Sequence, residues 1–388
     1  MSMKNKLKNF IKWIYFYCDN YFLKYFVKNS KTIESNQILL IRTDNIGDFI
    51  LWLWEAQKLK EVLKDIEITL ICNSVYSKLA KETKYFDKVI PLDIKKYNFN
   101  LKYKINFLRE LNKQKYKKII NPVNSRSVLT ESLVKNLEAV EKIGNYGDDT
   151  SLNKYLLKVS AKNYTKIFKE NIAIREELLK NLSFYNWCFN KKTELKKPII
   201  NFEKELINND IIKISNQNYY IFSLGASLKG KCWEIKKFRE LYLKKLKNNE
   251  MNLILVGSNS EVELGNRFLK EIDKKNIINL VGKTNLFELI HLVKKSKLIV
   301  GNDSLVVHLA NLFEKTNVCI IGGWHYQRYL PYPVESKIIN QIVVTTKKLD
   351  CFNCNFKCKY SDIPFKCIKN IKVEDVIRKI ENKKINRS

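Results

Sequence analysis

Two carboxylates, Asp44 and Asp48, stand four residues apart in the stretch RTDNIGDF, where an apolar run ends and a long amphipathic run begins. The pattern predicts a strand that ends at Arg42, a turn at 45–47 and a helix that begins near Asp48. Gly47 would permit a positive φ and let a ligand approach the backbone. Asp48 is then a candidate general base, or simply an N-cap that accepts a backbone N–H.

A loop of small residues, FSLGASLKGKCW, follows a second apolar run and carries Gly225, Ser227, Gly230 and Lys231. Backbone N–H groups, a helix N-terminus and a lysine together suit a phosphate group. The stretch is not a P-loop, because Cys232 stands where that motif requires Ser or Thr. The alternative interpretation is an ordinary strand-to-helix loop in a lysine-rich chain.

A third stretch, LIVGNDSLVVHLANLF, places Asp303 and Ser304 after an apolar run and His308 five residues beyond Asp303. If a helix begins near Ser304, its first-turn N–H groups are available to an anion and His308 lies one turn further along. A single histidine on a helix is more often a packing residue than a catalytic one. The pattern therefore leaves both interpretations of His308 open.

Four cysteines, Cys351, Cys354, Cys358 and Cys367, lie close together near the C-terminus. A C-x2-C pair with two further cysteines nearby is typical of a tetrahedral site for zinc or iron. Four thiolates leave no open coordination position, so such an ion would be structural. The alternative is a set of free thiols or a disulfide.

The elements that must position these residues alternate between short β-rich runs and helix-length segments, in two series at 37–143 and 219–322. This alternation predicts parallel sheets, and 388 residues are enough for two domains. We therefore expect an α/β fold with two doubly wound, Rossmann-like domains that face a cleft. The expected segments are an arm at 1–35, an N-terminal domain at 36–195, a linker at 196–217 and a C-terminal domain at 218–388, which contains the cysteine cluster at 351–367.

The formal net charge of +31 points to an anionic partner such as nucleic acid, an anionic membrane or a phosphorylated substrate. Lysines are spread along the whole chain, which argues against a nucleic-acid-binding stripe. The arm interleaves lysines with aromatic residues, as in a helix that lies on a membrane surface; alternatively, it packs on the protein's own core. With no long apolar span and no signal-peptide cleavage pattern, a cytoplasmic protein is expected.

The stretches RTDNIGD, LGASLKGKCWEIKKF and GNDSLVVHLA, in this order and spacing, resemble motifs of the heptosyltransferase family over about 37–370. That family uses ADP-heptose in lipopolysaccharide core assembly. The resemblance implies a GT-B fold and an inverting sugar transfer without a catalytic metal or cofactor. It implies that Asp48 is the general base on the acceptor hydroxyl and that Lys231 neutralises the departing diphosphate. The N-terminal domain would bind the acceptor and the C-terminal domain the nucleotide sugar.

The motifs and the resemblance together predict a set of donor-binding residues. In it, Glu261 would bind the ribose and Thr284 would line the adenine. Two positions depart from the family pattern: Asp44 replaces a small hydroxyl residue, and Leu305 replaces a glycine. The full set is Arg42, Gly47, Gly225, Ser227, Glu261, Thr284, Asp303, Ser304, His308 and Arg328.

The expected function is transfer of heptose, or a related sugar, from an ADP-sugar donor to a lipopolysaccharide or lipooligosaccharide core. The enzyme would be peripheral on the inner face of the cytoplasmic membrane, with a lipid-linked oligosaccharide acceptor and an anionic membrane surface as partners and no nucleic acid. One alternative is a protein O-heptosyltransferase that modifies Ser or Thr, because some related bacterial enzymes bind iron through four cysteines. A second alternative, from another class, is a basic nucleic-acid-binding protein.

Overall fold

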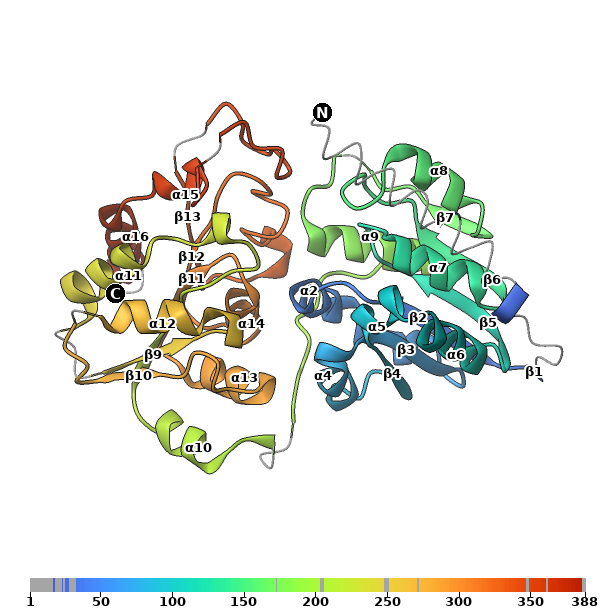
Figure 1. Ribbon diagram of the computed structural model, residues 1–388, viewed down its shortest axis with the longest axis horizontal. Helices are drawn as coiled ribbons and strands as arrows, with labels where there is room; N and C mark the ends of the chain where they lie inside the picture. The colour runs from blue at the N-terminus through green and yellow to red at the C-terminus, as the bar shows by residue number, and fades with distance from the viewer. Residues whose placement is uncertain are drawn as a thin grey trace. The chain divides into compact units, whose positions relative to one another are not determined.

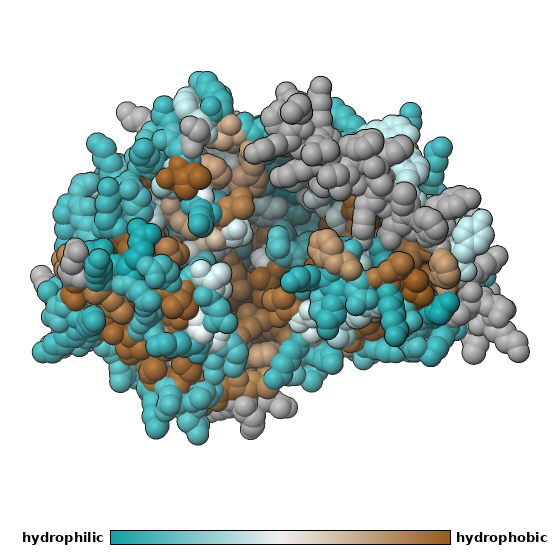
Figure 2. Space-filling model, viewed as in Figure 1, coloured by the Kyte–Doolittle hydropathy of each residue, from teal (hydrophilic) through white to brown (hydrophobic). Residues whose placement is uncertain are grey.

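The chain divides into two compact units, residues 1–201 and 202–388, each built on one parallel sheet with helices on both faces (Figure 1). The computed structural model describes residues 17, 23, 25–27 and 33–385, apart from 172, 203–205, 248–250, 271, 347–348 and 361. Hydrophilic side chains cover most of the outer surface of both units in the view of Figure 2, in keeping with the high content of charged residues.

The first unit contains a seven-stranded sheet in the order β4-β3-β2-β5-β6-β7, with β1 beside β5. Every strand pair in it is parallel. The strands are β1 (Ile33–Glu34), β2 (Gln37–Arg42), β3 (Glu67–Asn73), β4 (Lys88–Leu92), β5 (Gln114–Asn121), β6 (Ala139–Asn145) and β7 (Lys166–Phe168). The α-helices are α2 (Ile46–Ala56), α3 (Leu59–Val62), α4 (Ser77–Glu82), α5 (Ile94–Phe99), α6 (Leu101–Leu111), α7 (Val128–Asn136), α8 (Lys154–Ala161) and α9 (Glu177–Phe189).

The second unit contains a six-stranded sheet in the order β10-β9-β8-β11-β12-β13, again with parallel pairs throughout. Its strands are β8 (Tyr219–Ser223), β9 (Asn252–Val256), β10 (Ile277–Asn279), β11 (Leu298–Asn302), β12 (Asn317–Ile320) and β13 (Gln341–Val344). Its helices include the short 3-10 turn η3 (Lys229–Lys231), α10 (Asn209–Ser215), α11 (Ile235–Leu241), α12 (Val262–Leu269), α13 (Leu286–Lys295), α14 (Leu305–Leu312), α15 (Lys366–Lys369) and α16 (Val373–Ile385).

Both sheets have the same strand order relative to the chain, the doubly wound order of dinucleotide-binding folds. The predicted class of two Rossmann-like α/β units is therefore confirmed. The central strands are continuous apolar runs, because helices cover both of their faces; β11 is buried at every position. The direction of winding reverses between β2 and β5 in the first unit and between β8 and β11 in the second. Ligands of such folds bind beyond the carboxyl ends of the strands at these switch points.

Parts of the N-terminal arm pack against the core of the first unit. Leu23 and Val27 are 0% and 2% exposed and belong to its apolar cluster, whereas Tyr25 and Phe26 are 73% and 49% exposed. At these positions the arm follows the second of the two predicted alternatives. Apart from Tyr17 and residues 33–35, the rest of the arm lies outside the described residues, so the predicted membrane contact stays untested. A search of the described helices finds none with the length and hydropathy needed to cross a bilayer.

Candidate functional site

A buried ion pair joins the two central strands of the second unit at their carboxyl ends. Lys231 Nζ lies 2.8 Å from Asp303 Oδ2, and the two side chains are 11% and 5% exposed. Lys231 ends the loop that follows β8, and Asp303 comes directly after β11, the neighbouring strand. Burial raises the pKa of Asp303, but the Lys231 ammonium outweighs it and holds the pKa below its usual range. The Asp303 carboxylate is therefore ionised at neutral pH.

Asn302, the last residue of β11, fixes the loop that carries this lysine. Its Nδ2 donates to the carbonyl oxygens of Leu224 at 2.9 Å and Gly225 at 3.2 Å, and its Oδ1 accepts from the Trp233 N–H at 2.8 Å. Sequence reasoning missed Asn302. The available signal was a polar residue at the end of an otherwise apolar strand, because a fully buried amide must find hydrogen-bond partners.

The helix predicted to start near Ser304 is confirmed as α14, with Ser304 in the N-cap position. The Ser304 hydroxyl lies 3.4 Å from that of Ser223, at the end of β8. His308 is one turn further along and 5% exposed, with Nε2 3.9 Å from Asp303 Oδ1 and Nδ1 3.1 Å from the Tyr332 hydroxyl. Burial lowers the pKa of His308 to about 4, so the ring is neutral at physiological pH.

Glu261 lies against the loop that follows β8, the candidate phosphate-binding loop that carries Gly225. A Cβ on Gly225 would stand 1.7 Å from Glu261 Oε1, so glycine is required for this approach. The other carboxylate oxygen accepts from the Ser258 N–H at 2.6 Å and caps the turn before α12. The structure thus brings Glu261 to the carboxyl end of β9, next to Gly225. Its predicted role in ribose binding stays a prediction.

The remaining predicted donor positions in the second unit lie on loops. Ser227 is exposed on the loop after β8, and Thr284 is half-buried, two residues before α13. Helix α13 starts with a capping box from Asn285 to Glu288. Arg328 is half-buried in a turn, with Cζ 5.1 Å from the centre of the Tyr329 ring.

In the first unit, α2 begins at Ile46, so the predicted helix start near Asp48 is wrong by two residues. Asn45 takes the N-cap position, and Gly47 and Asp48 lie in the first turn. The predicted positive φ at Gly47 is also wrong: among the described glycines, the positive φ values belong to Gly147 and Gly282. Asn45 makes no side-chain cap hydrogen bond, but the helix dipole favours the Asp48 carboxylate in the first turn, so no glycine turn is needed. Asp48 is half-buried there.

Arg42 lies beneath this helix start and is 1% exposed. Its Nη2 is 3.0 Å from Asp44 Oδ2 and donates at 3.0 Å to the main-chain oxygen of Asp48. Its Cζ lies 5.5 Å from the centre of the Trp52 ring. Arg42 therefore ties the Asp44 carboxylate to the backbone of Asp48. A direct contact of Arg42 with a donor stays a prediction.

A third carboxylate, that of Glu177, lies close enough to Asp44 to affect its pKa. Burial raises the pKa of Asp44 to about 6 against the opposing Arg42 charge, and the charge of Glu177 raises it further. Glu177 is the first residue of α9 and is 3% exposed. Sequence reasoning missed Glu177, because only the packing of α9 on α2 brings it close to Asp44. The one local signal was an acidic residue at a helix start.

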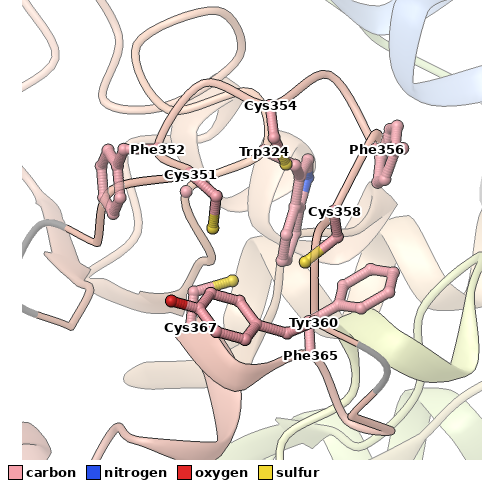
Figure 3. A pocket seen from close by; sticks show the side chains of 10 residues that line it. Trp324, Cys351, Phe352, Cys354, Phe356, Cys358, Tyr360, Phe365 and Cys367 are labelled. Carbon is pink, nitrogen blue, oxygen red and sulfur yellow. The ribbon is translucent and has the colours of Figure 1, made fainter.

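The four predicted metal-ligand cysteines line one small pocket, which we call the cysteine pocket. The sulfurs of Cys351, Cys358 and Cys367 point into the same space (Figure 3). Four thiols suit a tetrahedral ion in kind. However, the described part of the chain holds no group of three or more His, Cys, Asp or Glu side chains placed to bind a metal. A structural metal therefore stays a prediction. The other lining residues are Gly323, Trp324, Phe352, Phe356, Tyr360 and Phe365.

In comparison with known proteins, the sequence model of glycosyltransferase family 9 (heptosyltransferase) matches residues 105–359, more than half of the chain. Lipopolysaccharide heptosyltransferase 1 of Campylobacter coli is 24% identical over 355 residues, which cover 89% of this chain and 98% of that protein.

Solved structures share the fold. A family 9 glycosyltransferase from Veillonella parvula superposes with a TM-score of 0.71 at 17% identity, covering 91% of this chain and 98% of that one. The E. coli heptosyltransferase WaaC with ADP-2-deoxy-2-fluoro heptose superposes with a TM-score of 0.65 at 16% identity, covering 89% and 99%. At these identities the likeness supports the GT-B architecture of two Rossmann-like units.

Proposed function

The chain belongs to glycosyltransferase family 9, and from this premise we propose that it transfers heptose, or a closely related sugar, from an ADP-sugar to a lipopolysaccharide or lipooligosaccharide core acceptor. The transfer would invert the anomeric configuration and need no catalytic metal. The observation that carries this proposal is the buried Lys231–Asp303 pair at the switch point of the second unit. A preorganised lysine at that place suits a donor diphosphate.

On the donor side, the Lys231 ammonium has three N–H donors, of which one is directed at Asp303. The other two are available to phosphate oxygens of the donor. The charge of Lys231 would neutralise the diphosphate as the bond to the sugar breaks, which is the task a divalent ion performs in other transferases. His308 is neutral and contributes polarity without charge. The ADP-sugar in the similar E. coli enzyme supports ADP as the nucleotide.

On the acceptor side, Asp48 is the proposed general base. Its carboxylate takes the proton of the acceptor hydroxyl while the oxygen forms a bond to the anomeric carbon. The bond between that carbon and the donor phosphate breaks, and ADP leaves with its electron pair. Arg42 donates to the main-chain oxygen of Asp48 and so holds the first turn of α2, which carries this carboxylate.

The proposed acceptor is lipid-linked, and the proposed place of action is the inner face of the cytoplasmic membrane. A net charge of +31 favours contact with an anionic lipid surface and with a phosphorylated core. The similarity to a lipopolysaccharide heptosyltransferase supports the acceptor class. Flotation with liposomes that contain anionic lipid should carry the full chain upward, whereas neutral liposomes should not. Equal recovery with both would remove the membrane from this proposal.

A structural zinc or iron ion in the cysteine pocket is part of the proposal. Its support is the donor set, four thiols that line one space. Such an ion would tie residues 351–367 together. The proposed chemistry does not depend on it.

The deciding experiment is a donor screen with ADP-heptose and common UDP- and GDP-sugars, in which release of the nucleotide is measured. Each donor is tested with a heptose-deficient lipooligosaccharide, with a serine-containing peptide and without acceptor. We expect release of ADP that depends on the lipooligosaccharide, and its loss in Asp48→Ala with donor binding retained. Preference for a UDP- or GDP-sugar, transfer to the peptide or full activity of Asp48→Ala would each contradict the proposal.

A further inference from the structure

One residue, Trp324, lies both in the lining of the cysteine pocket and beside Lys231, the proposed phosphate-binding lysine. Trp324 lines the pocket and is 2% exposed, and the centre of its ring lies 5.5 Å from Lys231 Nζ. An ammonium near the face of a tryptophan ring is attracted by the ring quadrupole, and the attraction grows when water is excluded. Lys231 therefore has two buried contacts that fix its end group, the Asp303 carboxylate and the Trp324 ring.

A second pocket residue fixes the main chain next to the lysine. The Phe365 N–H donates to the carbonyl oxygen of Gly230 at 2.9 Å. The Phe365 ring fills the place of a Cβ on Gly230, which would stand 2.5 Å from the ring. Since Gly230 directly precedes Lys231, both the backbone and the end group of the lysine rest on residues that line the cysteine pocket.

Trp324 is in turn held by residues of the segment 351–367, which we call the cysteine segment. Its ring stacks on Phe356 with a centroid distance of 5.8 Å and meets Phe365 edge-on at 5.7 Å. A Cβ on Gly322 would stand 1.9 Å from the Trp324 ring and 2.6 Å from Cys367 Sγ, so the chain, the ring and one thiol are in close contact. The orientation of the indole therefore depends on Phe356, Phe365 and Cys367.

We propose that Trp324 is a positioning residue that holds the Lys231 ammonium beside Asp303, ready for the donor diphosphate, and that the cysteine segment acts on donor binding through this ring. The identity of the ligand rests on the proposed function; the position of the lysine does not. A lysine side chain has four rotatable bonds, so one carboxylate contact alone leaves much of its freedom. The ring face supplies the second restraint.

The first test compares the affinities of ADP and adenosine by calorimetry. Trp324→Leu removes the ring face and should weaken ADP binding by about tenfold. A cation–π contact contributes about 1–2 kcal/mol, and about 1.4 kcal/mol equals a tenfold change in affinity. Adenosine lacks phosphates and should bind as in the wild type. Phe352→Leu is the matched control: Phe352 lines the same pocket, but its ring contacts are with Gly323 and Tyr326, so both ligands should bind normally. Equal weakening of ADP and adenosine in Trp324→Leu would overturn the inference.

The second test needs no donor. Reductive methylation under native conditions, read by peptide mass spectrometry, measures how accessible each lysine is. Lys231 should react several-fold faster in Trp324→Leu than in the wild type, while Lys236, whose side chain is 74% exposed, serves as the internal reference. Trp324→Phe, which keeps a smaller ring, should give an intermediate rate and stands in if the leucine variant does not fold. A wild-type rate at Lys231 in the folded variant would overturn the inference. Failure of the wild type to bind ADP would instead remove the proposed donor, and methylation would still decide the role of Trp324.

Discussion

Lys231 Nζ and Asp303 Oδ2 lie 2.8 Å apart, in side chains that are 11% and 5% exposed. The pair spans the neighbouring strands β8 and β11, at the switch point where ligands of doubly wound sheets bind. Screening by water is weak for such buried groups, so the lysine is both fixed in place and able to act strongly on an incoming anion. The charge of the donor phosphates should therefore decide donor affinity.

Replacement of Lys231 by methionine removes the charge and keeps the length of the stem. We expect ADP affinity to fall by about 10- to 100-fold, because hydrogen bonds to charged groups contribute about 1.5–3 kcal/mol. Adenosine affinity should not change. Lys229→Met is the matched control, since Lys229 is an exposed lysine two residues earlier in the same loop. Calorimetry on both variants measures the effect, and an equal loss in the two would contradict a specific role for Lys231.

Asp48→Asn tests the general base. The change keeps the shape of the side chain but removes its ability to take a proton, so we expect kcat to fall by about 10²- to 10⁴-fold. The affinity for ADP should stay the same, because Asp48 lies in the first unit and Lys231 in the second. Initial rates at saturating donor and acceptor measure the change. A fall in ADP affinity with normal kcat would assign Asp48 to donor binding instead.

Asp44 should control the acid side of the pH profile. Its pKa is raised to about 6, so the carboxylate gains a proton as pH falls through this value and Arg42 loses its charged partner. Since Arg42 also holds the backbone of Asp48, kcat should decline below about pH 6 in the wild type. The asparagine in Asp44→Asn cannot titrate, so the kcat–pH profile of this variant should lack the decline below pH 6. Its kcat should be lower than that of the wild type. An unchanged acid limb in the variant would show that Asp44 is not the titrating group.

The sequence was sufficient to predict where residues that directly follow strands lie. It did not predict contacts between residues that are far apart along the chain. Lys231, Asp303 and Ser304 follow apolar runs, and the parallel sheet necessarily brings such positions to one edge. The predicted start of α2 was wrong by two residues, because the helix dipole favours the Asp48 carboxylate inside the first turn and the helix includes Gly47. Glu177 had only a weak local signal, an acidic residue at a helix start, because Asp44, the carboxylate it lies near, is more than a hundred residues away along the chain.

His308 should make the second unit less stable in acid. Its pKa is about 4 in the folded protein against 6.5 in the unfolded chain, so the unfolded state binds the proton more readily between these values. The contribution of the neutral ring is complete above pH 6.5 and is lost as pH falls towards 4. We expect the unfolding free energy of the wild type, relative to His308→Gln, to fall by up to about 3 kcal/mol across this window. Asp44 and Glu55, whose pKa values are raised, are present in both proteins. Their contributions therefore cancel in the difference between the two unfolding free energies. Urea unfolding at pH 7 and pH 4 measures the difference, and a constant difference would show that the ring is not held neutral.

The cysteine pocket provides the last prediction. If its four thiols hold a structural ion, purified protein should contain about one zinc or iron per chain, as expected for a tetrathiolate site. The Cys354→Ser/Cys358→Ser double variant should lose the metal and melt at a lower temperature, because binding free energy of the ion contributes to folding. Cys188→Ser is the control, since Cys188 lies on α9 in the first unit and should leave the metal content unchanged. Elemental analysis of the three proteins, together with a count of thiols that react under native conditions, gives the answer. Protein without metal and with freely reactive thiols at these positions would show that the pocket is held by its aromatic residues alone. In that case the support of Trp324 would come from Phe356 and Phe365 rather than from an ion.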